Sequence, residues 1–223
     1  LAMQRHGIDM IEVGIPFSDP LADGPVIQSA GTVALKNGMT LETLFGQLDA
    51  IKSQVNIPLV LMGYLNVIMH YGYERFCQRC VECGVSGFII PDLPFDDYLN
   101  EIKPLADRYN LRCIMMITPE TSEERIRFID RNTDGFIYMV SSASITGAQQ
   151  NFDEAKQQYF QRINAMNLHN PRMIGFGISN RQTLESAQNN AAGAIIGSKF
   201  VTLLRATGNA DEALSQLFDA LKK

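Results

Sequence analysis

The stretch IEVGIPFSDPLADGP, residues 11–25, joins an apolar strand pattern to a loop that contains three prolines. Residues 8–14 form an almost continuously apolar run, which is typical of a parallel strand covered on both faces. Residues 26–37 continue as a helix pattern. A strand, a stiff loop and a helix in this order predict one βα unit.

The same alternation recurs along the whole chain. Strand patterns occupy residues 8–14, 58–63, 87–91, 112–117, 135–140, 172–176 and 193–197. Helix patterns occupy residues 26–37, 41–54, 72–83, 95–109, 121–132, 153–167, 181–189 and 209–222. Predicted caps are Gly38 and Gly84 at helix C-termini, and Thr40 and Thr121 at N-termini. Strand–helix alternation predicts an α/β fold made of parallel βαβ units.

The number of strands bears on the architecture. Seven strands are countable, whereas a closed (β/α)8 barrel has eight. Residues 1–7, LAMQRHG, are typical of the end of a helix, whose own strand would precede Leu1. We therefore expect residues 1–223 to form a single TIM-barrel domain, N-terminally incomplete, with the first strand missing from this chain. The alternative is an open seven-stranded sheet.

Composition excludes several classes of protein. The net charge of −5 argues against binding to nucleic acid or to anionic membranes. No apolar run approaches the roughly 20 residues of a membrane span. Four cysteines do not indicate a disulfide framework, so we expect a reducing cytoplasmic location.

Three of the cysteines, Cys77, Cys80 and Cys83, are spaced like the start of an iron–sulfur motif. The position of a fourth ligand is Gly87, and the histidines share no metal-ligand spacing. We predict no metal site. The expected stripe of core-facing side chains on this helix is Phe76, Cys77, Cys80 and Val81.

Glu12 is a single glutamate near the end of the first strand, and Asp19 and Asp23 lie in the loop behind it. Apolar neighbours favour the protonated form of the Glu12 carboxyl, which suits general acid and base catalysis. A structural glutamate is an equal alternative on the residues alone. Asp19 fits a turn role better, and Asp23 fits a helix cap and a catalytic role about equally.

Glycine-containing loops follow the last three strands, at SITGA (144–148), GFGIS (175–179) and GSKF (197–200). In TIM barrels, the loops after the seventh and eighth strands commonly bind phosphate with backbone N–H groups at a helix start. The candidate phosphate-binding residues are Gly147, Gly177, Gly197 and Ser198.

The motif IEVGIPFSDPLADGPVIQ strongly resembles the tryptophan synthase α-subunit family. Further matches are LVLMGYLNVI (59–68), GFIIPDLPFDD (87–97), SSASITGA (141–148), GFGIS (175–179) and AIIGSKFV (194–201). The resemblance runs in order over essentially all 223 residues. It implies a lyase that cleaves indole-3-glycerol phosphate to indole and glyceraldehyde 3-phosphate by a retro-aldol reaction.

The resemblance also implies the role of each site residue. Glu12 matches the acid/base that protonates indole C3, and Asp23 matches the carboxylate that stabilises charge on the indole nitrogen. Tyr138 matches an active-site tyrosine, and Thr146 matches a residue of a lid loop. The glycines and Ser198 match the phosphate site. The residues that match the surface facing the partner are Asp92, Pro94, Asp19 and Pro20.

The implied partner is a pyridoxal-phosphate-dependent β subunit, which receives indole within an α2β2 heterotetramer. The α subunit has no cofactor of its own in this family. Two alternatives are a stand-alone indole-3-glycerol phosphate lyase and an inactive phosphate-binding barrel fragment. A related barrel enzyme, indoleglycerol-phosphate synthase, uses a lysine as general acid, and the first two strands of this chain contain no lysine.

Overall fold

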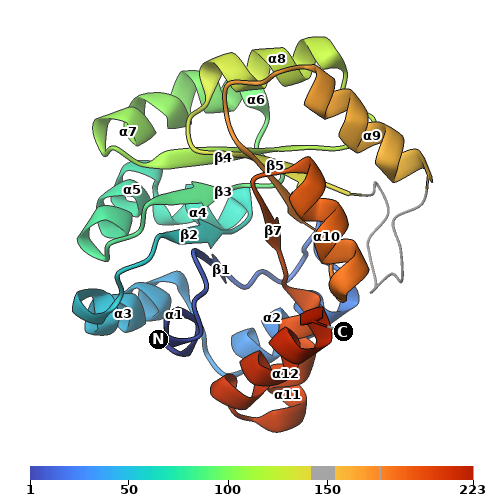
Figure 1. Ribbon diagram of the computed structural model, residues 1–223. Helices are drawn as coiled ribbons and strands as arrows, with labels where there is room; N and C mark the ends of the chain where they lie inside the picture. The colour runs from blue at the N-terminus through green and yellow to red at the C-terminus, as the bar shows by residue number, and fades with distance from the viewer. Residues whose placement is uncertain (142–153, 176, 223) are drawn as a thin grey trace. The chain divides into compact units, whose positions relative to one another are not determined.

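The computed structural model describes residues 1–141, 154–175 and 177–222 (Figure 1). These residues group into two compact units. The first comprises residues 1–22 and 28–114, and the second comprises residues 23–27 and the described part of residues 115–223. The expectation that they belong to a single domain stays a prediction.

Parallel strands form the sheet of the first unit. They are β1 (Ile11–Gly14), β2 (Leu59–Met62), β3 (Gly87–Ile89) and the first half of β4 (Arg112–Ile117). Glu12 of β1 pairs in register with Val60 of β2, and Leu61 with Phe88 of β3. The strands therefore follow one another in chain order, as βαβ units require.

Helices alternate with these strands. They are α1 (Ala2–Arg5), α2 (Pro25–Lys36), α3 (Leu41–Ile51) with the 3₁₀ turn η1 (Lys52–Gln54), α4 (Leu65–Tyr71), α5 (Tyr73–Glu82), α6 (Phe95–Asp97), the π-helical turn η2 (Tyr98–Ile102) and α7 (Lys103–Arg108). The rings of Phe45 and Phe88 each contact Phe76, with centroids 5.9 and 5.5 Å apart. These buried rings join α3, α5 and β3 into one apolar core.

The second unit continues the pattern. Its strands are the second half of β4, β5 (Ile137–Val140), β6 (Arg172–Gly175) and β7 (Gly193–Ile195), all parallel and again in chain order. Its helices are α8 (Glu123–Asn132), α9 (Glu154–Ala165), α10 (Arg181–Asn190), α11 (Ser198–Thr207) and α12 (Ala210–Lys222).

Buried side chains hold α8 and α9 in this unit. Ile126 of α8 and Ile163 of α9 are fully buried. Arg162 of α9 donates to the carbonyl oxygens of Pro119 and Thr121, at 2.8 and 3.2 Å. These bonds fix the loop between β4 and α8, because they satisfy carbonyl groups that have no strand or helix partner.

The predicted strands are confirmed, and their hydrogen-bonded order is β1-β2-β3-β4-β5-β6-β7. The predicted cap at Thr40 is also confirmed, since its side chain accepts from the amide of Thr43. Gly38 and Gly84 have φ angles of 81° and 74°, which is the left-handed conformation expected after a helix. Two helices, α4 and α11, were not among the predicted patterns.

Two sequence predictions about helices were wrong. Ser122, not Thr121, caps α8, because the hydroxyl of Thr121 accepts from the amide of Thr118 within a turn. Val81 is 48% exposed, whereas Cys83 is buried with Phe76. At about 100° per residue, Cys83 returns to the direction of Phe76 after seven residues, and Val81 points away.

Candidate active site

Glu12 is the second residue of β1, where the sequence pattern placed it. Its side chain is half-buried, and its Oε2 atom is shielded from solvent. Three residues later, the amide of Ile15 donates to the carbonyl of Met62 at 2.7 Å, which extends the pairing with β2 beyond the strand end. Glu12 therefore lies close to the C-terminal end of a parallel strand, where barrel enzymes place catalytic groups.

Tyr64, the residue before α4, contacts the loop behind β1 at two points. The Tyr64 side chain is 3% exposed. Its ring contacts Phe17 with centroids 5.3 Å apart, and its hydroxyl oxygen accepts the amide N–H of Ala22 at 2.9 Å. The middle of the loop faces solvent, since Asp19 is exposed and Leu21 is 75% exposed.

Asp23 follows directly and belongs to the second unit. It lies two residues before Pro25, the first residue of α2. Asp23 is half-buried. The partial positive charge at a helix N-terminus favours an ionised carboxylate in this position. The setting of Asp23, before a helix, therefore differs from that of Glu12, on a strand.

Tyr138 lies on β5 and is buried. The neighbouring strand β6 ends at Gly175, which pairs with Val140. A β-carbon built on Gly175 would overlap the Tyr138 hydroxyl and would lie 2.5 Å from its ring carbons Cε1 and Cζ. Glycine is therefore required at position 175, because the tyrosine side chain occupies the space that any other residue would need.

The predicted phosphate-binding residues that the structure describes are also in the second unit. Gly177 has a φ angle of 80°, which few other residues adopt. Gly197 is the N-cap residue of α11, and Ser198 is its first residue. A β-carbon built on Gly197 would lie 3.8 Å from Cδ1 of Ile27. The segment that begins with Asp23 thus lies against the start of α11.

Gly197, the N-cap residue of α11, has no side chain that could cap the helix. The amide N–H groups of a helix's first turn have no partner within the helix. A glycine at the N-cap lets another molecule approach these groups closely. The N-terminus of α11 is therefore suited to binding a phosphate group.

Residues assigned to a partner surface lie in the first unit. Asp92 is half-buried, and its Oδ1 atom accepts the amide N–H of Leu65 at 2.9 Å. This bond caps the N-terminus of α4, a structural role that the sequence did not indicate. Pro94 is the exposed N-cap residue of α6. Asp19 is exposed and accepts a hydrogen bond from the hydroxyl of Ser18, and Pro20, which follows it, is half-buried. Thr146 and Gly147 lie outside the described residues.

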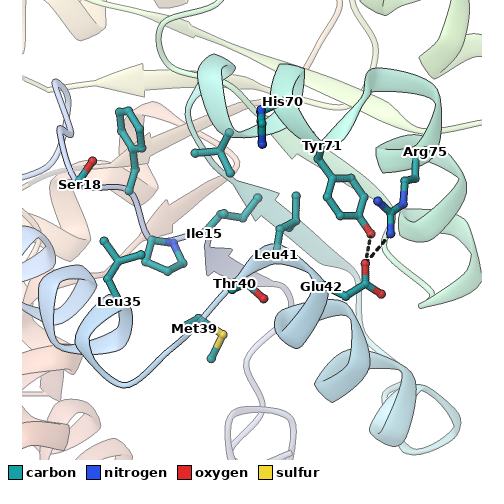
Figure 2. A pocket seen from close by; sticks show the side chains of 13 residues that line it. Ile15, Ser18, Leu35, Met39, Thr40, Leu41, Glu42, His70, Tyr71 and Arg75 are labelled. Carbon is teal, nitrogen blue, oxygen red and sulfur yellow. Dashed lines mark hydrogen bonds and ion pairs between the residues drawn. The ribbon is translucent and has the colours of Figure 1, made fainter.

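A pocket of about 570 Å³ opens beside the loop in the first unit (Figure 2). Apolar side chains of the loop, α2 and α4 line most of it, among them Ile15, Leu35 and Val67. Neither Glu12 nor Asp23 contributes to this pocket.

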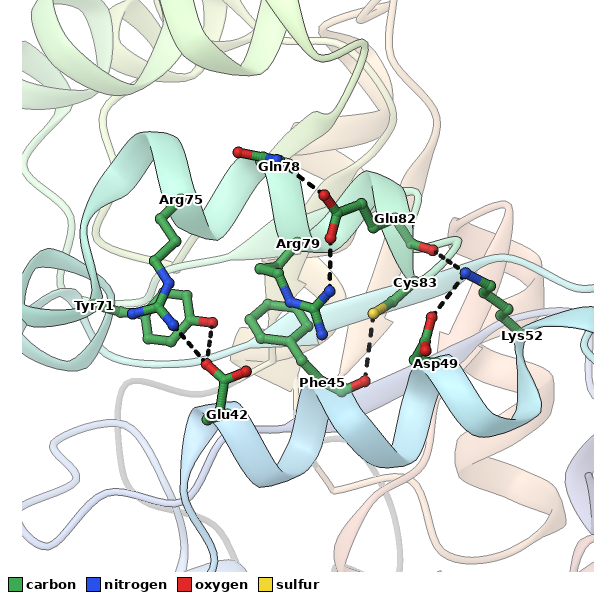
Figure 3. Close-up of polar contacts among 10 residues, drawn as sticks. All are labelled: Glu42, Phe45, Asp49, Lys52, Tyr71, Arg75, Gln78, Arg79, Glu82 and Cys83. Carbon is green, nitrogen blue, oxygen red and sulfur yellow. Dashed lines mark hydrogen bonds and ion pairs between the residues drawn. The ribbon is translucent and has the colours of Figure 1, made fainter.

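Polar groups at one end of the pocket join α3 to α5 (Figures 2 and 3). Glu42 accepts from the hydroxyl of Tyr71 and from Nη2 of Arg75, both at 2.8 Å. Further along, Cys83 donates to the carbonyl of Phe45 at 3.4 Å (Figure 3). These contacts link α3 to α4 and α5, and none of them involves a predicted site residue.

The cysteine cluster, Cys77, Cys80 and Cys83, is buried in the apolar core. Burial raises the pKa of Cys77 to about 11, and the nearby Arg108 only partly opposes this. Burial likewise raises the pKa values of Cys80 and Cys83. Metal ligation requires thiolates, which this environment disfavours. Within the described part of the chain, no group of three or more His, Cys, Asp or Glu side chains is arranged to hold a metal ion.

No helix of the described residues is long and apolar enough to cross a membrane.

Comparisons with known proteins agree on one family. The family model described as "Tryptophan synthase alpha chain" matches residues 1–222. The tryptophan synthase alpha chain of Parabacteroides distasonis is 64% identical over 222 residues, covering 100% of this chain and 86% of the relative. That of Phocaeicola vulgatus is 65% identical over 221 residues, covering 99% and 86%.

Solved structures with a similar fold belong to the same family. A mutant tryptophan synthase alpha-subunit from Pyrococcus furiosus superimposes with a TM-score of 0.89 at 31% identity, covering 99% of this chain and 89% of that one. The corresponding chain in the tryptophan synthase complex from the same organism gives 0.88 at 30% identity, with coverage of 99% and 88%. The predicted α/β fold of the TIM-barrel class is thus confirmed.

Proposed function

Because this chain belongs to the tryptophan synthase alpha chain family, we propose that Glu12 and Asp23 carry out its reaction together. The chain is a carbon–carbon lyase that cleaves indole-3-glycerol phosphate to indole and glyceraldehyde 3-phosphate. Indole passes to a β subunit, to which the pyridoxal phosphate of the complex is bound.

In the proposed mechanism, Glu12 exchanges two protons with the substrate. Its carboxyl group gives a proton to indole C3, and the resulting carboxylate takes the proton of the glycerol hydroxyl on the adjacent carbon. The electrons of that O–H bond form the aldehyde as the C–C bond breaks, and those of the broken bond return to the ring. Glu12 ends protonated, as it began. Its shielded Oε2 atom supports this assignment, because burial favours the neutral carboxyl that must donate first.

Asp23 stabilises the positive charge that develops on the indole nitrogen once C3 is protonated. An ionised carboxylate at a fixed position supplies this stabilisation without reorganising during the reaction. The position of Asp23 before α2 supports the ionised form. Two carboxylates in unlike settings can therefore perform acid and electrostatic roles at one pH.

The remaining predicted residues bind and enclose the substrate in this proposal. The backbone around Gly177, Gly197 and Ser198 holds the phosphate, together with Gly147. Tyr138 lines the pocket for the reacting part of the substrate, and Thr146 belongs to the lid. The open N-terminus of α11 is the observation that supports the phosphate assignment.

Asp92, Pro94, Asp19 and Pro20 form the proposed surface toward the β subunit, and Pro94 and Asp19 are exposed. A cytoplasmic location is also part of the proposal. It is supported by the four free, buried cysteines of the chain.

The test is the release of indole from indole-3-glycerol phosphate by the full-length protein with its β subunit. Glu12→Gln removes the proton donor and keeps the size, so kcat should fall by about 100-fold or more. Asp23→Asn removes the charge and should cost about 100-fold as well. Activity of Glu12→Gln within a few-fold of the wild type would refute the role of Glu12.

A further inference from the structure

Tyr64 contacts both the start and the end of the loop between β1 and α2, residues 15–24. Its ring contacts Phe17, and its hydroxyl accepts the amide N–H of Ala22, the residue immediately before Asp23. Tyr64 is 42 residues away from Ala22 in the chain. The residues between the two anchor points include the exposed Asp19 and Leu21, so the middle of the loop has little apolar contact of its own.

The position of Tyr64 is itself tightly determined. Its side chain is 3% exposed. The preceding residue, Gly63, donates to the carbonyl of Ile89 at 3.0 Å and has no room for a β-carbon, which would lie 2.7 Å from Cδ1 of Ile15. On the other side, Asp92 accepts the amide N–H of Leu65 at 2.9 Å. Hydrogen bonds donated by the backbone amides of Gly63 and Leu65, on either side of Tyr64, therefore fix the point from which its side chain extends.

We propose that Tyr64 is a positioning residue for the lyase reaction, which holds the Asp23 carboxylate in place through the amide of Ala22. This inference rests on the proposed role of Asp23. Electrostatic stabilisation of a transition state depends on a charge held at a fixed position, and a misplacement of about 1 Å can cost 10²-fold in rate. The Tyr64 hydroxyl supplies this constraint one residue before the charge.

The first variant for the test is Tyr64→Phe, which keeps the ring and its contact with Phe17 but removes the acceptor of the Ala22 amide. In the full-length protein with its β subunit, we expect kcat to fall by about 10-fold or more. KM should change by less than about threefold, because the proposed phosphate contacts belong to other loops. The matched control is Tyr159→Phe, since Tyr159 is equally buried and donates through its hydroxyl to Ile117 at 3.3 Å. It should keep kcat within about twofold.

The double variant separates positioning from a general structural effect. If Tyr64 acts through Asp23, then Tyr64→Phe should lower kcat no further once Asp23→Asn is present. An additional loss equal to that in the wild type would overturn the proposal and leave the role of Asp23 intact. If Asp23→Asn alone retains full activity, the proposed role of Asp23 is wrong. The proposed role of Tyr64 then fails with it, because Tyr64 would position a residue that the reaction does not need.

Amide hydrogen exchange tests the underlying contact without relying on a variant. In the wild-type protein, the Ala22 amide should exchange more slowly than an unprotected amide by about 10-fold or more. The Tyr64→Phe protein should lose this protection. An unprotected Ala22 amide in the folded wild type would contradict the proposed anchor.

Discussion

The helices α10 and α11 start in similar places and differ in how their first turns are satisfied. Each follows a parallel strand of the second unit. At the start of α10, Asn180 accepts from the amide of Thr183, and the Thr183 hydroxyl accepts from the amides of Ser179 and Asn180. At the start of α11, Gly197 offers no side chain. One helix start is closed by the protein itself, and the other is open to a ligand.

This difference shows how one local geometry serves two purposes. N–H groups at a helix start must find acceptors, and a capping side chain provides them permanently. A glycine leaves the same groups for an anion that comes and goes. The phosphate assignment to α11 rather than α10 follows from this difference.

The carboxylate of Asp130, near the end of α8 in the same unit, is a second polar group whose hydrogen bonds come from the protein itself. Its carboxylate accepts from the amides of His169 and Asn170, at 2.8 and 2.9 Å, and from the Asn170 side chain at 3.1 Å. Burial alone would raise the pKa of Asp130, but these hydrogen bonds outweigh it and lower the pKa. Asp130 therefore uses its charge for stability.

Among these variants, the largest loss of stability is expected for substitution of Asp130. Asp130→Ala removes an acceptor of several hydrogen bonds and should lower the free energy of unfolding by about 2–4 kcal/mol, with KM unchanged. Urea unfolding monitored by circular dichroism measures the first quantity. A large increase in KM with normal stability would contradict the structural role.

The contribution of Asp130 should depend on pH. Because folding lowers the pKa of Asp130, the stabilisation is present above the unfolded value of about 3.8. It should disappear as the pH falls through the lower, folded value. The difference in stability between the wild type and Asp130→Asn should therefore shrink below about pH 4. A difference that grows toward low pH would have the wrong sign.

At the open start of α11, Ser198→Asp should separate binding from stability. The new carboxylate would repel the substrate phosphate and compete for the same N–H groups, so KM should rise by about 30-fold. The stability should stay equal or increase by a few tenths of a kcal/mol, because an acid favours a helix N-terminus. Steady-state kinetics and thermal unfolding measure the two effects. An unchanged KM would remove α11 from the phosphate site.

The smallest effect is expected at the closed start of α10. Asn180→Ala should lower the free energy of unfolding by about 1 kcal/mol, which is typical for the loss of an N-cap. KM should stay within about twofold, since Gly177, the proposed phosphate-binding residue before this helix, is unchanged and lies three residues away from Asn180. A KM increase comparable to that of Ser198→Asp would show that both helix starts contact the phosphate, and the comparison between them would fail.

Much of the fold was predictable because it depends on local patterns. The seven strands, the cap at Thr40 and the positive φ at Gly38 follow from apolar runs and from residue types that suit special backbone positions. Glu12 and Asp23 were proposed in the same way, from their expected places near a strand end and before a helix; the structure gives them these places, and their catalytic roles stay predictions.

The side-chain contacts to the loop before Asp23 and to the start of α4 were not predictable from such patterns. Nothing near Tyr64 indicates that its hydroxyl meets the amide of Ala22, because the two are adjacent only after β1 and β2 pair. The cap that Asp92 provides to α4 is equally non-local, since 27 residues separate it from Leu65. Side-chain contacts between distant segments depend on register and loop path, which a single sequence does not reveal.

The most direct test of the account is a structure of the full-length protein with a non-cleavable analogue of indole-3-glycerol phosphate. We predict that the indole N–H lies about 2.7–3.2 Å from the Asp23 carboxylate, with indole C3 facing Glu12. The phosphate should accept hydrogen bonds from the backbone at Gly177 and the start of α11. An indole ring placed away from both carboxylates would contradict the account.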